Sequence, residues 1–283
     1  MIQRIFLASG GLLLLLALLL FGKTNTIKAD FPHENHSLST FNIEVAITRE
    51  KQKLSPPQLI YVSNLENNIS RGDIKIQAEK QFTLLADFWK DSVGIFIPYA
   101  YYLSEGAKLD NSEKKLTFAA RLILENMRRE DSAELKIWEA ETAASLFERA
   151  LKLDPDNNDL EVGLGSCYVY GQGIIGDAEQ TMKGIQQLLK VVRKDSNNMQ
   201  AQMVLGIGAV ISRQFDKGIE RLSKVVAFDP QNPEAVSWLA DAYAGSGDRK
   251  NATKWYEQSK HLINNPAFSK EVDERIKALS TRP

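Results

Sequence analysis

Three glycines between residues 171 and 176 form the most suggestive chemical motif in this sequence. Gly171, Gly173 and Gly176 have the G-x-G-x-x-G spacing of a dinucleotide-binding turn, and Asp195 follows at about the distance of a ribose-binding acid. That fingerprint must follow a buried strand, whereas residues 160–170 have the apolar spacing of a helix. We therefore interpret the glycines as a permissive turn between helices, either a loop that contacts a partner or a tolerated insertion, and not as a nucleotide site.

The other candidates for chemistry lack the neighbours that their chemistry needs. His33, His36 and His261 have no carboxylate or cysteine at metal-ligand spacing, and Cys167 has no histidine nearby in the sequence to activate it. No G-x-S-x-G elbow, phosphate loop or H-E-x-x-H motif occurs. We predict that the protein is not an enzyme, uses no cofactor or metal, and has no small-molecule substrate.

A turn motif that recurs along the chain indicates an internal repeat. Its copies begin 41 and then 34 residues apart, at Asp154-Pro155-Asp156-Asn157, Asp195-Ser196-Asn197-Asn198 and Asp229-Pro230-Gln231-Asn232. Small and large apolar residues recur at the same steps, in the columns Gly165, Gly206, Ala240 and Gly184/Leu188, Gly218/Leu222, Ala252/Tyr256. Such a period predicts stacked helix pairs, because one pair cannot bury its own apolar face.

Each part of the repeat has a physical role. The small residues allow two antiparallel helices to approach closely, and the larger residue four positions later fills the space beside that contact. Proline in the turn stops the preceding helix, and the asparagine that ends the turn can cap the next one. Cys167 has Gly208 and Ala242 as its repeat equivalents, so we interpret it as a packing residue and not as a reactive thiol.

This pattern resembles the tetratricopeptide repeat (TPR) family, whose unit is a helix-turn-helix of about 34 residues. Residues 199–232 and 233–266 match it as full repeats, and residues 158–198 match with seven extra residues between Tyr170 and Gly184. An earlier repeat has its helices at 116–127 and 139–153, and Ala100, Ser104 and Ala107 indicate a degenerate copy before it. The resemblance implies an all-α, TPR-like solenoid.

The resemblance also implies a scaffold that binds a partner protein or peptide on the concave face of the solenoid, in bacteria often during envelope assembly. First helices line that face in this family, which gives as candidates Asp159, Val162, Ser166, Val169, Gln200, Met203, Ile207, Val210, Glu234, Ser237, Asp241 and Ala244. The set is apolar in the middle with acidic ends, and it lacks the basic and asparagine residues with which some members clamp a C-terminal carboxylate. We expect an apolar or weakly basic segment as ligand, unless a neighbouring helix covers Met203, Ile207 and Val210.

In the alternative function, residues 41–110 make the contact with the partner and the repeats are a structural spacer in a membrane complex. A formal net charge of −1 argues against a nucleic-acid partner in either case.

Residues 5–22 are uncharged and rich in leucine. As a helix they would extend about 27 Å, close to the hydrocarbon thickness of a bilayer. We expect an uncleaved single-pass transmembrane anchor, and a signal peptide cut after Ala29 is the alternative. The flanking basic residues nearly balance, but the short leading segment favours an inside amino terminus, with the repeats on the extracytoplasmic (periplasmic) side.

The pattern divides the rest of the chain into four parts. We expect a polar tether at 23–40 and an N-terminal helical region at 41–112 that includes the degenerate repeat. TPR-like repeats should follow at 113–266, and a capping helix with a charged outer face at 267–283.

Overall fold

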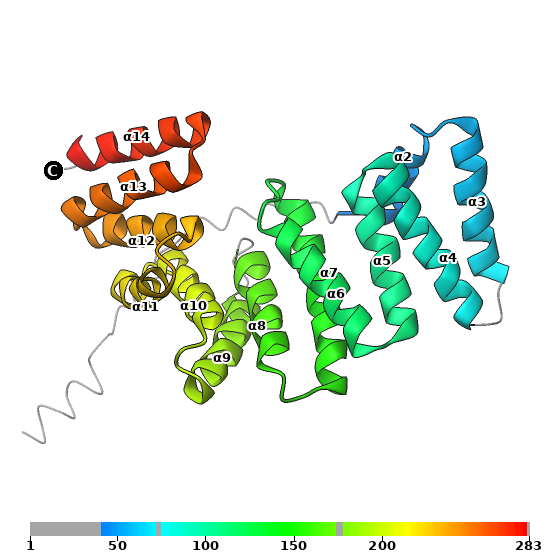
Figure 1. The fold of residues 1–283 in the computed structure, drawn as a ribbon, viewed down its shortest axis with the longest axis horizontal. Coiled ribbons are helices and arrows are strands. Elements are labelled where there is room, and N and C mark those ends of the chain that lie inside the picture. Colours follow the sequence, from blue (N-terminus) through cyan, green and yellow to red (C-terminus); the bar gives the residue numbers. More distant parts are fainter. Residues whose placement is uncertain (1–40, 72–74, 174–177, 282–283) are drawn as a thin grey trace, which may run out of the picture. The chain divides into compact units, whose positions relative to one another are not determined.

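The computed structural model describes residues 41–71, 75–173 and 178–281. By its contacts the chain divides into two units, Met1–Ser39 and Thr40–Pro283, and every described residue lies in the second. Its elements are all helical (Figure 1): α2 (Ile43–Lys51), α3 (Pro56–Arg71), α4 (Lys75–Asp87), the π-helix η1 (Phe88–Val93), α5 (Phe96–Asp110), α6 (Glu113–Met127), α7 (Ala133–Leu153), α8 (Asn158–Cys167), the π-helix η2 (Tyr168–Gln172), α9 (Ala178–Lys194), α10 (Met199–Ile211), α11 (Phe215–Phe228), α12 (Pro233–Ser246), α13 (Arg249–Ile263) and α14 (Pro266–Thr281). The expectation of an all-α fold is confirmed.

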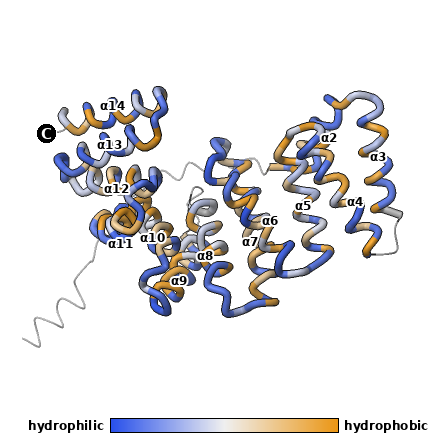
Figure 2. Tube along the Cα trace, in the orientation of Figure 1, coloured by the Kyte–Doolittle hydropathy of each residue, from blue (hydrophilic) through white to orange (hydrophobic). Residues whose placement is uncertain are grey.

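Consecutive helices pack in pairs, α4 with α5, α6 with α7, α8 with α9, α10 with α11 and α12 with α13. Each pair also contacts the next one along the sequence (Figure 1). Hydrophobic and hydrophilic residues alternate along these helices (Figure 2), as they do in helices that bury one face. Ala100, Ser104 and Ala107 of α5, the residues that indicated a degenerate copy, are buried.

The turn motif begins each first helix as predicted. Asn157, Asn198 and Asn232 are N-caps, and the side-chain oxygen of each accepts a hydrogen bond from the backbone N–H three residues later. Asp195 and Asp229 stabilise the turn itself, because each accepts a hydrogen bond from the N–H two residues on. The boundaries of the repeats therefore follow from local side-chain chemistry.

The small-residue columns lie where helices cross closely. A methyl group placed on Gly206 would lie 2.7 Å from Leu222 Cγ, and one on Gly165 would lie 3.1 Å from the Gly184 carbonyl oxygen. Carbon atoms in favourable contact are about 3.5–4.0 Å apart, so neither crossing has room for a side chain. Cys167 is also buried, and burial raises the pKa of its thiol, which confirms its interpretation as a packing residue.

Two of the repeat helices are longer than the sequence pattern indicated. Helix α7 begins at Ala133 and not near residue 139, because the Ser132 hydroxyl accepts the Leu135 N–H and caps the helix there. Helix α8 continues into the π-helical turn η2, which extends to Gln172. The extra residues of this repeat therefore begin within a helix.

Gly171, in η2, is a packing residue, so the expectation of a permissive turn is wrong for it, whereas Gly173 follows η2 and lies in a turn. A methyl group on Gly171 would lie 2.1 Å from Ala140 Cβ, and one on Gly173 would lie 2.5 Å from the Val169 carbonyl oxygen. A helix precedes them, so the structural context of a dinucleotide fingerprint is missing. The third glycine of the motif, Gly176, lies outside the described residues.

Helix α14 buries Val272 and Leu279 and exposes charged residues, as the predicted capping helix should. The predicted anchor at 5–22 and tether at 23–40 lie outside the described residues. No helix within the described ranges has both the length and the apolar character needed to cross a membrane.

Candidate partner-binding groove

The structure places the predicted binding residues in two different environments. Gln200 and Asp159 are exposed, and Ser237, Asp241, Glu234 and Ala244 are partly buried. The other six are almost fully covered, with exposed fractions of 1% for Val162, 4% for Ser166, 1% for Val169, 7% for Met203, 0% for Ile207 and 8% for Val210. Val162, Ser166, Met203, Ile207 and Val210 belong to the core and are not accessible to a partner, whereas Val169 also lines one of the hollows described below.

Neighbouring helices cover these side chains. Met203, Ile207 and Val210 pack in one cluster with Leu222 of α11 and Leu239 of α12. Val162 and Val169 lie in a second cluster with side chains of α9 and α10. Helix α10 contacts α8, α9, α11 and α12, and as a result every residue from 201 to 210 is buried. The space between successive first helices is therefore filled by their own apolar residues.

Asp241 is bound within the protein. Its Oδ1 accepts hydrogen bonds from the Tyr256 hydroxyl at 2.6 Å and from Arg275 Nη1 at 2.8 Å. Burial and this hydrogen bond raise the pKa of the Tyr256 phenol, which therefore stays neutral and donates. Asp241 thus connects α12 with α13 and α14, and its carboxylate already accepts hydrogen bonds from within the protein.

Three hollows lie along the first helices, and together we call them the groove. The first, the polar hollow, has a volume of about 330 Å³ and lies between α6, α8 and α10. Arg121, Glu125, Arg128, Asp159 and Gln200 are its polar lining residues. Arg121 Nη2 lies 3.3 Å from Asp159 Oδ2, an exposed pair that joins α6 to α8 across this hollow.

The second, the aromatic hollow, has a volume of about 360 Å³. Its apolar lining comes from four elements: Met127 of α6, Val169 and Tyr170 of η2, Ile211 of α10 and Trp238 of α12. The charged groups Arg128, Lys136 and Glu234 complete it. Burial raises the pKa of Tyr170 to about 12, so its hydroxyl is neutral at pH 7. The hollow is suited to an apolar or aromatic side chain.

Arg128 lines both of these hollows. Its guanidinium forms ion pairs with Glu234, at the start of α12, and with Glu125, and its Cζ lies 5.7 Å from the centre of the Tyr170 ring. The Arg128 and Glu234 side chains are each 32% exposed, so we expect their pair to stabilise the fold by at most about 1 kcal/mol. The Arg128 side chain therefore lies between the two hollows, and its ion pair with Glu234 is weak enough for a ligand to displace.

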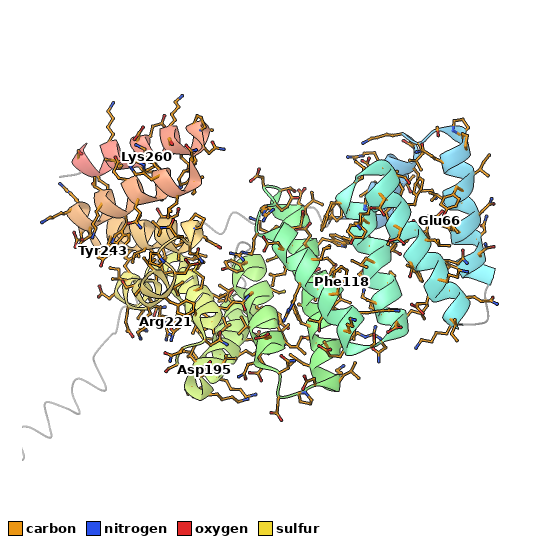
Figure 3. The ribbon with its side chains drawn as sticks, in the orientation of Figure 1. Glu66, Phe118, Asp195, Arg221, Tyr243 and Lys260 are labelled. Carbon is orange, nitrogen blue, oxygen red and sulfur yellow. The ribbon has the colours of Figure 1, made fainter. Side chains whose placement is uncertain are left out.

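The third, the Phe118 hollow, measures about 220 Å³ and lies between α4, α5 and α6. Phe118 is 56% exposed (Figure 3) and lies one helical turn from Arg121 of the polar hollow. Lys115 beside it is paired with Glu79 and Asp110. The exposed Phe118 ring therefore extends the groove to the helix pair α4–α5.

Sequence reasoning missed Arg128, Tyr170, Ile211 and Trp238. In α8 and α12 the predicted Asp159 and Glu234 do line the groove, but the next lining residue is Gly163 instead of Val162 and Trp238 instead of Ser237. One residue rotates the face of a helix by about 100°, which exchanges a core position for one that faces the groove. Aromatic and basic residues at positions outside the repeat columns were the sequence signal that could have indicated the groove.

The groove is lined by charged, polar and apolar side chains. Within residues 41–281, wherever the structure is described, no three histidine, cysteine, aspartate or glutamate side chains are placed to hold a metal. Most charged groups of the groove, such as Arg121 with Asp159 and Arg128 with Glu234, form ion pairs beside apolar walls.

Successive helix pairs with close glycine crossings, Asn-capped first helices and a groove along those helices define a helical-repeat protein with the tetratricopeptide fold. The crystal structure of TTC0263, described as a thermophilic TPR protein in Thermus thermophilus, matches 72% of this chain and 100% of its own with a TM-score of 0.51 and 16% sequence identity. At this identity the likeness concerns the fold, and it confirms the TPR-like architecture.

Two further solved structures are similar at lower scores. MamA from Desulfovibrio magneticus RS-1 matches 68% of this chain and 97% of its own, with 21% identity and a TM-score of 0.46. YrrB, described as a TPR protein with an unusual peptide-binding site, matches 74% and 96%, with 17% identity and a TM-score of 0.44. No protein-family model and no curated protein matches the sequence.

Proposed function

We propose that this protein is a scaffold that binds a segment of a partner protein in the groove, with the aromatic hollow as its main anchor point. The observation that carries the proposal is the meeting of Tyr170, Ile211 and Trp238, from three different helical elements, around one open space of about 360 Å³. Ile211 is 49% exposed, an unfavourable state that a bound apolar side chain would relieve. Solenoids of this kind generally bind through surfaces that several repeats build together.

The ligand should carry an apolar or aromatic side chain flanked by polar groups. The apolar walls of the aromatic hollow accommodate that side chain, and the paired Arg128 and Glu234 at its edge can exchange partners with charged groups of either sign. Lys136 adds a second cation, which disfavours a strongly basic segment. By analogy alone, we place this role in the assembly of a bacterial envelope complex.

The double variant Ile211→Asp, Trp238→Ala should weaken partner capture at least about tenfold. Removal of a central aromatic anchor typically costs about 2 kcal/mol or more of binding free energy. Ile211 is half exposed, but Trp238 packs partly against the core cluster of α10, α11 and α12, so the helical circular dichroism should persist while the unfolding midpoint falls. Quantitative pull-down from cell extract measures the effect. Phe228→Asp is the matched control, since Phe228 is 73% exposed on α11 and lines none of the three hollows. Equal capture by the double variant and the wild type would contradict the proposal.

We further propose that residues 5–22 tether the scaffold to a membrane, with the repeats on the extracytoplasmic side. Support comes from the uncharged sequence of eighteen residues alone. The full-length protein should stay in the membrane fraction after carbonate extraction. Recovery of a soluble chain trimmed after Ala29 would instead establish a signal peptide.

A further inference from the structure

Helix α3 exposes apolar side chains at one end of the helix array. Leu59, Ile60 and Tyr61 are 39%, 62% and 42% exposed, whereas Val62 and Leu65 of the same helix are buried. The helix at the other end, α14, presents mainly charged residues to solvent. End units of repeat arrays need polar outer faces, so exposed apolar side chains on an end helix mark a candidate interaction site.

A cleft of about 480 Å³ lies beside these side chains, between α3 and the segment formed by α4 and η1. Tyr61 from α3 and Phe88 from η1 line it, with their ring centroids 5.5 Å apart and tilted by 46°. Pro57 and Leu84 add to its apolar walls. The cleft shares no lining residue with the aromatic or the polar hollow, and it shares only Asp87 with the Phe118 hollow.

The charged residues that line this cleft are both acidic. Asp87 and Asp91 are exposed; Asp87 is the last residue of α4, immediately before Phe88, and Asp91 lies in the middle of the π-helix η1. Such turns are rare and are frequently found at functional sites. Lys90 Nζ lies 3.5 Å from Asp91 Oδ1, but both side chains are more than half exposed, so this pair neutralises the carboxylate only weakly.

We propose that this cleft binds a helical segment of a partner protein that presents an apolar side chain and, one turn away, a lysine or arginine. The apolar side chain packs between Tyr61, Phe88 and Pro57, and the cation pairs with Asp87 and Asp91 beside the aromatic rings. A second copy of this chain is a poorer occupant, because a two-fold contact would bring the same acidic residues of the two copies together.

Two designed helical peptides test the proposal, each of about 15 residues and carrying a fluorescent label. One places a leucine and a lysine four residues apart, and the other replaces the lysine with glutamate. We expect fluorescence anisotropy with the full-length chain at low salt to show the lysine peptide binding about tenfold tighter. Asp87→Asn combined with Asp91→Asn should remove this preference, and Tyr61→Ala should weaken both peptides. Asp159→Asn, which changes an exposed carboxylate of the groove, should preserve it.

Three outcomes of the binding assay would overturn the proposal, and a fourth would come from sedimentation. These are no binding of the lysine peptide at about millimolar concentration, equal affinity for both peptides, and a preference that survives the double asparagine variant. Self-association in sedimentation that Ile60→Asp abolishes would also overturn it, because the occupant would then be a second copy. Both carboxylates are exposed, so the variants should fold, and circular dichroism checks this. The groove variant at Ile211 and Trp238 should bind the lysine peptide normally, which keeps this test independent of the proposed function.

Discussion

Replacing Gly206 with leucine should destabilise the fold by about 1–3 kcal/mol, near the upper end of that range. Gly206 lies where α10 crosses α11, and even a methyl group there would lie 2.7 Å from Leu222 Cγ and 3.0 Å from its Cδ2. Leu222 is fully buried and cannot move aside without disturbing the cluster around it. The crossing must therefore open or both side chains must leave their preferred rotamers.

Chemical denaturation monitored by circular dichroism measures this effect. Gly208→Ala is the matched control on the same helix, because its new methyl group would lie 3.3 Å from its nearest neighbour, Val169 Cγ1. That variant should be close to neutral, since the higher helix propensity of alanine offsets the mild crowding. Equal losses of stability at the two positions would show that Gly206 is not at a close crossing, and would contradict the repeat register.

The second large effect concerns Glu139, a buried carboxyl on α7. Its side chain is 0% exposed, Oε1 accepts a hydrogen bond from Asn126 Nδ2 at 2.7 Å, and Oε2 has no hydrogen-bond partner among the described residues. Burial raises the pKa of Glu139 from 4.5 to about 7, and the bond from Asn126 offsets only part of this. The neutral acid is therefore the favoured form in the folded protein.

The sign of the pH dependence follows from this raised pKa. Between pH 4.5 and about 7 the unfolded chain releases the Glu139 proton while the folded chain keeps it, so this residue lowers the free energy of unfolding as pH rises. The full loss above pH 7 should be about 2–3 kcal/mol. Glu139→Gln removes the titration, so its stability relative to wild type should increase by that amount between pH 4.5 and about 8.

Denaturation midpoints across this pH range check the prediction. Glu141→Gln provides the control, because Glu141 is exposed on the same helix and its variant should follow the wild-type profile. A constant difference between Glu139→Gln and wild type across the whole range would show that Glu139 is ionised in the folded protein and that its burial is relieved in solution.

The repeat helices could be predicted from sequence because local chemistry determines them. Asn157, Asn198 and Asn232 cap helices wherever the turn motif recurs. The glycine columns recur because the two helices of each repeat cross closely at the same position. These features depend on neighbours within one or two helices.

The groove could not be predicted in the same way, because it depends on how successive pairs stack. The family pattern placed Met203 and Ile207 on an open face, but contacts of α10 with four other helices bury them. Arg128 reaches Glu234 more than 100 residues away in the sequence, from a stretch that the repeat does not include. Such contacts have no period in the sequence, so only the three-dimensional arrangement shows them.

Site-specific photo-crosslinking is the most direct test of partner binding in the groove. Benzoylphenylalanine would replace Trp238 of the aromatic hollow, Phe118 of the Phe118 hollow, or Phe228, which is exposed on α11 outside the groove. After irradiation in intact cells, we predict that positions 238 and 118 give an adduct with the same partner and that position 228 gives none. An adduct formed equally at position 228, or at position 228 alone, would contradict the assignment of the groove as the binding surface.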